Sequence, residues 1–271
     1  MTSPPDLTII TISTNELFRL RDCLPSVPAA AGALRIEHVV IDNASIDGTS
    51  LFVASQFPSV TLLRNERKTG FATNNNLAIN RTDSRYVLLL NPDTVLTPGS
   101  LEKIVRYCDD HSDVGAASCK LVNPDGSLQH NVRRFPTLLA VMLRWAQFER
   151  FHPNSKILRD YLLSDWDHNS ERDIDWAIGA FLLVRRQVIA AVGPLDAAYD
   201  PLYYEDIDWC FRIKQNGWKI RFVPGVQIIH HYHRESARGI FNKMTYIHFR
   251  NIVRFLVRRW RAERHREHSA G

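Results

Sequence analysis

The segment Tyr86-Val87-Leu88-Leu89-Leu90-Asn91-Pro92-Asp93 decides the fold, because an apolar run stops abruptly at an amide, a proline and a carboxylate. A short continuous apolar run predicts a strand that is buried on both faces of a sheet. Ligands of open α/β sheets bind outside the carboxyl ends of the strands. Asp93 is therefore a candidate ligand of a divalent metal, which can in turn hold a diphosphate. Asn-Pro-Asp-Thr is also good turn chemistry, so this segment alone favours neither interpretation.

The flanking sequence predicts a mostly parallel, doubly wound α/β sheet, because strand-like and helix-like runs alternate at short intervals. Ser13, Thr14 or Asn15 is available to cap the first helix. The expected strands are 7–12, 37–41, 60–63 and 86–90, and the expected helices are 15–25, 49–56, 71–80 and 98–110. A second regular region follows, with an apolar run at 176–184 and a helix at 185–191.

We expect one domain over residues 1–236 and a basic helical extension over 237–271. The 271 residues, 45% hydrophobic and 23% charged, are enough for one large globular core. Residues 134–173 mix aromatics, charges and prolines without one period, which predicts a mobile insertion or lid.

The sequence favours a cytoplasmic location. It lacks a basic stretch followed by a long apolar stretch near its start, so we expect no signal peptide. No apolar run reaches the ~18 residues that span a bilayer. The cysteines are scattered without a Cys-x-x-Cys pair, which is typical of reduced, buried thiols. They are Cys23, Cys108, Cys119 and Cys210.

The positive charge of the chain is concentrated at its C-terminal end. Residues 238–271 contain nine Lys or Arg and two Glu, a net charge of +7, whereas the whole chain has +5. Apolar and basic residues in this segment recur at helical spacing on different faces, which predicts a basic amphipathic helix. The apolar set is Phe249, Ile252, Val253, Leu256 and Trp260, and the basic set is Arg250, Arg254, Arg258 and Arg261. Such a helix can lie on an anionic membrane or pack on the domain, and the two are compatible.

A dinucleotide-binding site is excluded at the first strand. No Gly-x-Gly-x-x-Gly follows that strand in Ser13–Arg19, and the chain has no P-loop motif. A nucleotidyltransferase would also require a glycine-rich, basic loop after the first strand, and residues 13–21 lack one. A bound nucleotide would therefore need another group to neutralise its phosphates, and a metal held by Asp93 is the candidate.

Two polar segments follow predicted strands. After the second strand, the Asp42 carboxylate can accept the imide N–H of uracil or thymine, with Asn43 and Ser45 able to hydrogen-bond nearby. A turn and a helix cap would explain the same composition. The later segment 65–76 combines Gly70, which allows close backbone approach, with several amides, although a solvated loop is an alternative.

Acids and a histidine mark the last third of the chain. Glu205, Asp206 and Asp208 lie in the first turns of a predicted helix, where the helix dipole alone favours acids by ~0.3–1 kcal/mol each. Neighbouring aromatics would desolvate a carboxylate and raise its basicity, as a general base requires. Acids repel phosphate, so these residues argue against a nucleic-acid surface. His230 follows another apolar run and is a candidate metal ligand.

In their order and spacing, these motifs resemble the family 2 glycosyltransferases and, within them, are most similar to the rhamnosyltransferase-like branch. The resemblance covers about residues 7–236. It is carried by Ile41-Asp42-Asn43-Ala44-Ser45, Asn65 with Gly70-Phe71-Ala72, Leu90-Asn91-Pro92-Asp93, Gly179-Ala180-Phe181, Glu205-Asp206, Asp208, Gly217-Trp218 and His230.

The resemblance implies a GT-A fold, Mg²⁺ or Mn²⁺, and inversion at the anomeric carbon. It implies a nucleotide-sugar donor, dTDP-rhamnose or a UDP-sugar. The acceptor would be a glycan or a polyprenyl-linked molecule in cell-envelope polysaccharide synthesis. The enzyme would then lie peripherally at the cytoplasmic face of the inner membrane. The rival expectation is a non-catalytic GT-A-like protein whose basic tail binds membrane or nucleic acid.

The resemblance also implies residue roles. Asp42 would bind the base, Asp206 would be the general base, and Asp93 would be the remaining acid of an Asp-x-Asp motif with Asn91 at its first position. His230 would contact the metal or diphosphate, with His231 as a competitor. The other expected nucleotide-sugar contacts are Thr11, Asn43, Ser45, Gly70, Asn75 and Asn91; the other catalytic candidates are Glu205 and Asp208; the acceptor contacts are Trp176, Gly179 and Trp209.

Overall fold

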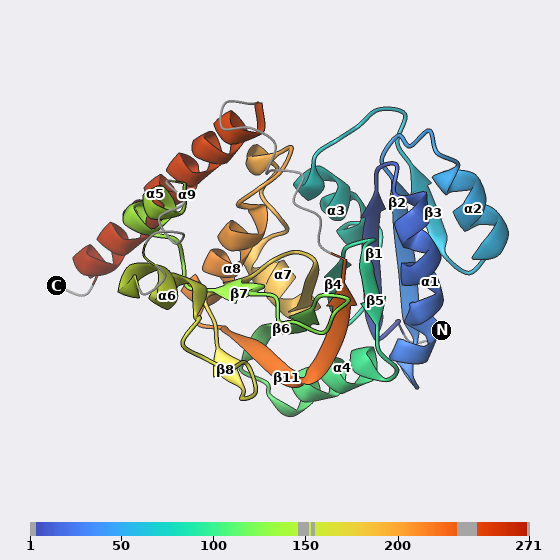
Figure 1. Ribbon diagram of the computed structural model, residues 1–271, viewed down its shortest axis with the longest axis horizontal. Helices are drawn as coiled ribbons and strands as arrows, with labels where there is room; N and C mark the ends of the chain where they lie inside the picture. Colours follow the sequence, from blue (N-terminus) through green and yellow to red (C-terminus); the bar gives the residue numbers. More distant parts are fainter. Residues whose placement is uncertain (1–3, 146–151, 153–154, 232–242, 270–271) are drawn as a thin grey trace.

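A computed structural model describes residues 4–145, 152, 155–231 and 243–269 (Figure 1). Within these residues a nine-stranded sheet has the strand order β3-β2-β1-β4-β10-β6-β11-β5, with β8 paired to β11. Strands β7 and β9 form a separate pair. Helices cover both faces of the large sheet, as the predicted doubly wound class requires (Figure 1).

The strands and helices have the following bounds. The strands are β1 Leu7–Ser13, β2 Ile36–Asp42, β3 Thr61–Arg64, β4 Tyr86–Leu90, β5 Thr94–Leu96, β6 Val114–Val122, β7 Val132–Arg133, β8 Arg172–Asp173, β9 Trp176–Ala177, β10 Phe181–Arg185 and β11 Lys219–His230. The helices are α1 Leu17–Ala31, α2 Thr49–Gln56, α3 Phe71–Ile79, α4 Ser100–Asp110, α5 Leu138–Trp145, α6 Lys156–Leu162, α7 Arg186–Val192, α8 Glu205–Gln215 and α9 Lys243–Ser269.

The N-terminal half follows the predicted alternation of strands and helices closely, and β1 to β4 are parallel. One helix end is wrong: α1 continues six residues beyond Pro25 to Ala31, because its apolar face goes on packing through Val27 and Ala30. The predicted cap is also wrong. The Leu17 N–H donates to the Asp47 carboxylate at 2.9 Å, so α1 is capped from the loop after β2.

The sheet is mixed because β10 inserts antiparallel between β4 and β6. Phe181 at the start of β10 pairs with Leu90 at the end of β4. The two residues before β10, Gly179 and Ala180, therefore lie at the carboxyl edge of the parallel strands, beside the Asn-Pro-Asp motif.

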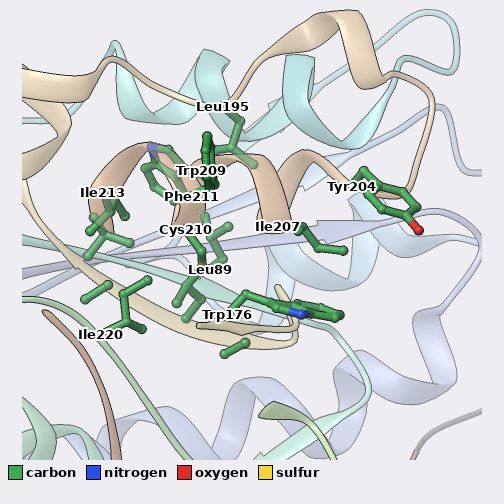
Figure 2. Packing of buried hydrophobic residues seen from close by; sticks show 14 of the residues in the cluster. Leu89, Trp176, Leu195, Tyr204, Ile207, Trp209, Cys210, Phe211, Ile213 and Ile220 are labelled. Carbon is green, nitrogen blue, oxygen red and sulfur yellow. The ribbon is translucent and has the colours of Figure 1, made fainter. Parts of the chain in front are cut away.

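Strand β4 is buried on both faces, as its sequence predicts. Leu88 and Leu90 pack with α1 and α4 on one side of the sheet, and Val87 and Leu89 pack with α3, α7 and α8 on the other. Figure 2 shows Leu89 within this second cluster, together with α8 side chains. The two apolar layers hold the end of β4, and with it Asp93, in a fixed position.

The predicted insertion at 134–173 contains α5 and α6 in its described part, while 146–151 and 153–154 lie outside the described residues. The predicted extension at 237–271 contains α9, and its residues 237–242 and 270–271 lie outside the description. None of the described helices combines the length and the apolar character needed to cross a membrane.

Candidate active site

The Asn-Pro-Asp motif is held at the carboxyl edge of the sheet by two strands. The Asn91 N–H donates to the Ala180 carbonyl at 3.0 Å, which fixes the motif against the start of β10. The chain then continues into β5, where Thr94 pairs with His230 at the end of β11. This crossing brings Asp93 beside His230, although the two residues are far apart in sequence.

Asp93 and His230 form a candidate metal site. The Asp93 Oδ1 and His230 Nε2 atoms are 3.3 Å apart, and the His230 side chain is only 2% exposed. Burial opposes ionisation of Asp93, but the adjacent imidazole outweighs it, so the pKa of Asp93 is lowered. The imidazole beside the Asp93 carboxylate is that of His230. His231 contacts Asp93 through the backbone, where its N–H donates to the Asp93 carbonyl at 2.8 Å.

The donor set fits a divalent metal that is shared with a ligand. Asp93 Oδ1 is buried and makes no aligned hydrogen bond, so one carboxylate oxygen is available for coordination. Among the described residues there is no cluster of three or more metal-binding side chains. Mg²⁺ and Mn²⁺ accept one carboxylate with phosphate oxygens and water as their other ligands. The protein would therefore supply Asp93 and His230, and a diphosphate and water would supply the rest.

Gln129 orients His230 and was missed by the sequence analysis. Its Nε2 donates to the His230 carbonyl at 2.7 Å, and its Oε1 lies 2.7 Å from His230 Nδ1. Because a carbonyl can only accept, the amide orientation is fixed and Oε1 must accept from Nδ1–H. His230 therefore presents Nε2 toward Asp93, the arrangement in which an outer residue sets the tautomer of a metal-binding histidine.

Asp206 lies in the first turn of α8 and is linked to the Asn-Pro-Asp motif through one dipeptide. Its Oδ2 accepts the Gly179 N–H at 3.2 Å, and the next residue, Ala180, accepts from Asn91. Gly179 lies close to Phe71: a Cβ there would lie 3.1 Å from the Phe71 ring, so any other residue would require the ring to shift. The predicted base and the predicted metal motif are thus joined by two hydrogen bonds.

The environment makes Asp206 a suitable base. Burial raises the pKa of Asp206 to about 6, although the N–H groups of Ile207 and Gly179 act in the opposite direction. Asp206 as a residue is half-buried, whereas its neighbours Glu205 and Ile207 are buried. A carboxylate with this pKa is ionised at neutral pH and is more basic than an ordinary aspartate.

Glu205 is the neutral partner of Asp206. Burial and the neighbouring charge of Asp206 raise the pKa of Glu205 well above its usual range. The side chain is 4% exposed and its Oε2 has no hydrogen-bond partner. The pair therefore carries one negative charge at neutral pH, and the more exposed Asp206 holds it.

The position of Asp208 contradicts a catalytic role. The side chain is fully buried and both of its oxygens accept from Arg258 of α9 at 2.7 Å. Arg212 Nε donates at 2.9 Å and the Tyr199 hydroxyl at 3.1 Å. With its charge paired and its lone pairs occupied, Asp208 attaches α9 to the domain.

Asp42 lies at the end of β2, at the same edge of the sheet. Its Oδ1 accepts the Ser45 N–H at 2.9 Å and its Oδ2 accepts the Ser50 hydroxyl. Asn43 donates to Thr14 and to the Thr69 carbonyl, both at 3.2 Å. Its Oδ1 accepts from Asn65 and Thr69.

The predicted neighbours of Asp42 therefore serve mainly to shape its loop. The Asn43 amide is fully used by the protein, and the Ser45 hydroxyl accepts the Asn15 N–H at 2.9 Å. Thr11 is fully buried within β1, with its hydroxyl 3.0 Å from His38 Nε2, which contradicts a nucleotide contact. Asp42 is itself only 4% exposed and both of its oxygens have protein partners, so its contact with the base stays a prediction.

Gly70 and Asn75 also have internal partners. A Cβ on Gly70 would lie 2.0 Å from Asp200 Cγ, and the Asp200 carboxylate accepts the Ala72 N–H at 3.0 Å. Asp200 therefore caps α3, where a phosphate could otherwise bind. Asn75 is 1% exposed and donates to the Phe71 carbonyl at 2.9 Å. The geometry contradicts the predicted nucleotide contacts of Gly70 and Asn75.

The two tryptophans predicted at the acceptor are both buried, at 4% exposed for Trp176 and 0% for Trp209. Trp209 is fully buried in the core and donates to the Gly193 carbonyl at 3.0 Å, so the prediction for Trp209 is wrong (Figure 2). Trp176 donates to the Arg134 carbonyl at 2.8 Å and has the Arg133 guanidinium 5.2 Å from its ring. Trp176 and Gly179 stay predictions at the border of the site.

Comparison with known proteins identifies a family and related sequences. A family model described as glycosyl transferase family 2 matches residues 8–168. An N-acetylglucosaminyl-diphospho-decaprenol L-rhamnosyltransferase of Mycobacterium tuberculosis is 28% identical over 83% of this chain and 76% of its own length. The rhamnosyltransferase WbbL of Escherichia coli is 29% identical over 70% of this chain and 71% of its own.

Solved structures support the fold. A mannosyltransferase from Pyrobaculum calidifontis, solved with GDP-Man and Mn²⁺, superposes with a TM-score of 0.58 at 20% identity, over 86% of this chain. GalNAc-T7, solved with UDP, GalNAc and Mn²⁺, gives 0.60 at 15% identity over 87%. The chain spans 59% and 45% of those two proteins, so they are longer than the shared fold.

Proposed function

The chain belongs to glycosyl transferase family 2 and is a glycosyltransferase, and we propose that it transfers rhamnose from a nucleotide-diphosphate sugar to a lipid-linked or glycan hydroxyl. The geometry that carries this proposal is the pair of hydrogen bonds from Asn91 to Ala180 and from Gly179 to Asp206. They bring a basic carboxylate next to a metal motif, as sugar transfer from a diphosphate requires. The rhamnosyltransferase relatives motivate the choice of sugar.

The reaction is a single displacement with inversion. Asp206 removes the proton of the acceptor hydroxyl as the oxygen attacks the anomeric carbon, and the bond from that carbon to the diphosphate oxygen breaks on the opposite side. Glu205, held neutral, limits negative charge beside the attacking oxygen. Both acids lie at the start of α8, so their positions are set by one rigid helix.

Asp93 and His230 would hold Mg²⁺ or Mn²⁺, and Asn91 shapes the turn that presents Asp93. When bound, the metal would neutralise the negative charge that develops on the leaving diphosphate. Asp42 would accept the imide N–H of thymine or uracil, so dTDP-rhamnose and UDP-sugars are the candidate donors.

The proposed place of action is the cytoplasmic face of the membrane in cell-envelope polysaccharide synthesis. The M. tuberculosis relative is named for a decaprenol-linked acceptor, which motivates a polyprenyl-linked acceptor here. The alternative of a non-catalytic binding protein is not favoured, because the family match and the rhamnosyltransferase relatives indicate a catalytic protein. Nucleic acid is not a proposed partner.

The direct test measures transfer from dTDP-rhamnose and UDP-sugars to a polyprenyl-diphosphate acceptor with and without Mn²⁺. We expect Asp206→Asn to lower kcat by about 10²–10⁴-fold while donor binding persists, because only the base is removed. Asp165→Asn, on an acid outside the site, serves as the matched control. Near-normal transfer by Asp206→Asn would show that another group is the base.

A further inference from the structure

Helix α9 has two opposite apolar faces. Ile247, Ile252 and Phe255 are at most 5% exposed and pack toward the domain. A second set recurs every three or four residues, which places it on one stripe of the helix. This outward stripe consists of Tyr246, Phe249, Val253, Val257 and Trp260, between 42% and 68% exposed. The sequence pattern places Ile252 on one face with Phe249, Val253 and Trp260. In the structure Ile252 packs inward, whereas the other three point outward.

Helix α9 is attached to the segment that leads into the catalytic acids. The Asn251 side chain is fully buried and donates to the carbonyls of Tyr199, Leu202 and Tyr203 at 2.7, 3.0 and 2.9 Å. Further along the helix, Arg258 pairs with Asp208 of α8. Whatever binds the outward stripe of α9 is therefore mechanically connected to the beginning of α8.

Positive charge accompanies the outward stripe. Arg250, Arg254 and Arg261 lie one position after Phe249, Val253 and Trp260, so they flank the stripe along one side. Arg250 and Arg254 each donate to a neutral backbone carbonyl of the domain, that of Asp200 and that of Ala198, so their positive charge is not neutralised by these contacts. Arg264 lies over the Trp260 ring at 4.6 Å. Aromatic and aliphatic side chains bordered by arginines match the boundary of an anionic bilayer, where apolar side chains enter and the guanidinium groups meet lipid phosphates.

The same charge disfavours the other occupants. A second copy that packed stripe to stripe in the antiparallel sense would bring like-charged arginine rows together, because the two-fold axis then places both rows on the same side. A buried protein partner would have to desolvate these arginines, whereas a lipid surface leaves them in the hydrated headgroup layer. The length of α9, 27 residues, suits a helix that lies in the plane of the bilayer.

We propose that the outward stripe of α9 docks on an anionic lipid bilayer and that its attachment to the segment 199–208 presents the catalytic acids to a lipid-linked acceptor. This inference deepens the proposed function and rests on it only for the acceptor. Docking itself depends on the residues of α9 alone.

Co-sedimentation of the full chain with vesicles tests the docking. The probes are phosphatidylethanolamine–phosphatidylglycerol vesicles and neutral phosphatidylcholine vesicles. We expect binding to the first kind, weakened by salt, and a loss of at least about tenfold in Phe249→Ser/Val253→Ser/Trp260→Ser. Phe18→Ser/Leu51→Ser is the matched control, because these side chains are also exposed, at 60% and 75%, on α1 and α2. Circular dichroism and thermal unfolding would establish that each variant is folded.

Equal vesicle binding by the wild type and the α9 variant would overturn the proposal. The proposal would also be overturned if the wild type is a dimer that does not bind vesicles and the α9 variant is a monomer. Transfer to a short-chain, water-soluble acceptor should be the same in the wild type and the α9 variant, with a difference only for acceptor embedded in vesicles. Vesicle binding without turnover of any sugar nucleotide would support docking and contradict the proposed function, so the two failures are distinguishable.

Discussion

At the scale of single residues, the two acids at the start of α8 differ in role because their surroundings differ. Asp206 accepts two backbone N–H groups and keeps some exposed surface, whereas Glu205 is buried with an oxygen that has no partner. Burial raises the pKa of both carboxyl groups, but at Asp206 the two N–H donors oppose the rise and the pKa is about 6, whereas at Glu205 the charge of Asp206 adds to it. These surroundings support the proposal that Asp206 is the base and Glu205 its neutral neighbour.

The pH dependence of transfer should report this base. With the pKa of Asp206 at about 6, the carboxylate is protonated below that pH and cannot accept a proton. We expect kcat/KM to rise as the pH increases through about 6 and then to level off, as measured over a pH series at saturating metal. A rate that is flat between pH 5 and pH 8 would contradict the assignment.

Replacing Glu205 by glutamine separates the two acids. Because Glu205 is already neutral, Glu205→Gln should keep kcat/KM within about tenfold and leave the base ionisable. The measurement is the pH profile of the variant, compared with that of Asp206→Asn. If Glu205→Gln is the variant that loses transfer while Asp206→Asn retains it, Glu205 is the base.

Gln129 should affect the metal without touching it. Gln129→Leu removes the acceptor of His230 Nδ1–H, so Nε2 is no longer held toward Asp93, and Mn²⁺ affinity should fall by about 10–100-fold. Calorimetric titration of Mn²⁺ in the presence of nucleoside diphosphate measures this directly. Gln129→Glu, which keeps an acceptor, should lose less. Equal affinities in all three proteins would show that Gln129 does not position His230.

At the scale of elements, α9 is part of the domain, because buried polar contacts fix it to the segment before α8. Arg258 supplies two bonds to the buried Asp208 and one to Asp196, all at 2.7 Å. The inward face of α9 therefore stabilises the domain through these ion pairs, independently of what the outward face binds.

Loss of Arg258 should therefore destabilise the whole domain. Arg258→Ala leaves Asp208 buried with Arg212 as its remaining cation, and breaking a buried pair typically costs ~3–5 kcal/mol. We expect a loss toward the lower end of that range in urea unfolding. Arg259→Ala is the matched control: its pair with Glu263 is at the surface and should contribute only ~0–1 kcal/mol. Equal stabilities of the two variants would contradict the structural role of Asp208.

At the scale of the whole molecule, the site exists because three strands end at one edge of the sheet. The turn after β4 supplies Asp93, the end of β2 supplies Asp42, and the end of β11 supplies His230, which β5 brings into contact with Asp93. The segment that leads into the antiparallel β10 then adds Gly179, which donates to Asp206. A ligand that binds these elements together should stabilise the entire fold.

Thermal unfolding tests this coupling. We expect Mn²⁺ and a nucleotide (dTDP or UDP) added together to raise Tm more than either does alone. A ligand at a concentration of about 100 times its Kd stabilises the folded state by about 2.7 kcal/mol. Asp93→Ala should abolish the contribution of the metal and leave that of the nucleotide small. An undiminished Mn²⁺ effect in Asp93→Ala would place the metal elsewhere.

The sequence by itself determined the α/β class, the bounds of most N-terminal elements, the family and the positions of Asp42, Asp93, Asp206 and His230. These depend on local periodicity and on acids that follow apolar runs, and both are visible in one dimension. Only the tertiary structure decided that Asp208, Trp209 and Thr11 are structural. It also revealed Asp200, Gln129 and Arg258, whose partners lie 128, 101 and 50 residues away. Packing between distant segments decides whether an acid pairs with an arginine, accepts a backbone N–H or keeps an oxygen without a hydrogen bond. No local sequence pattern encodes this choice.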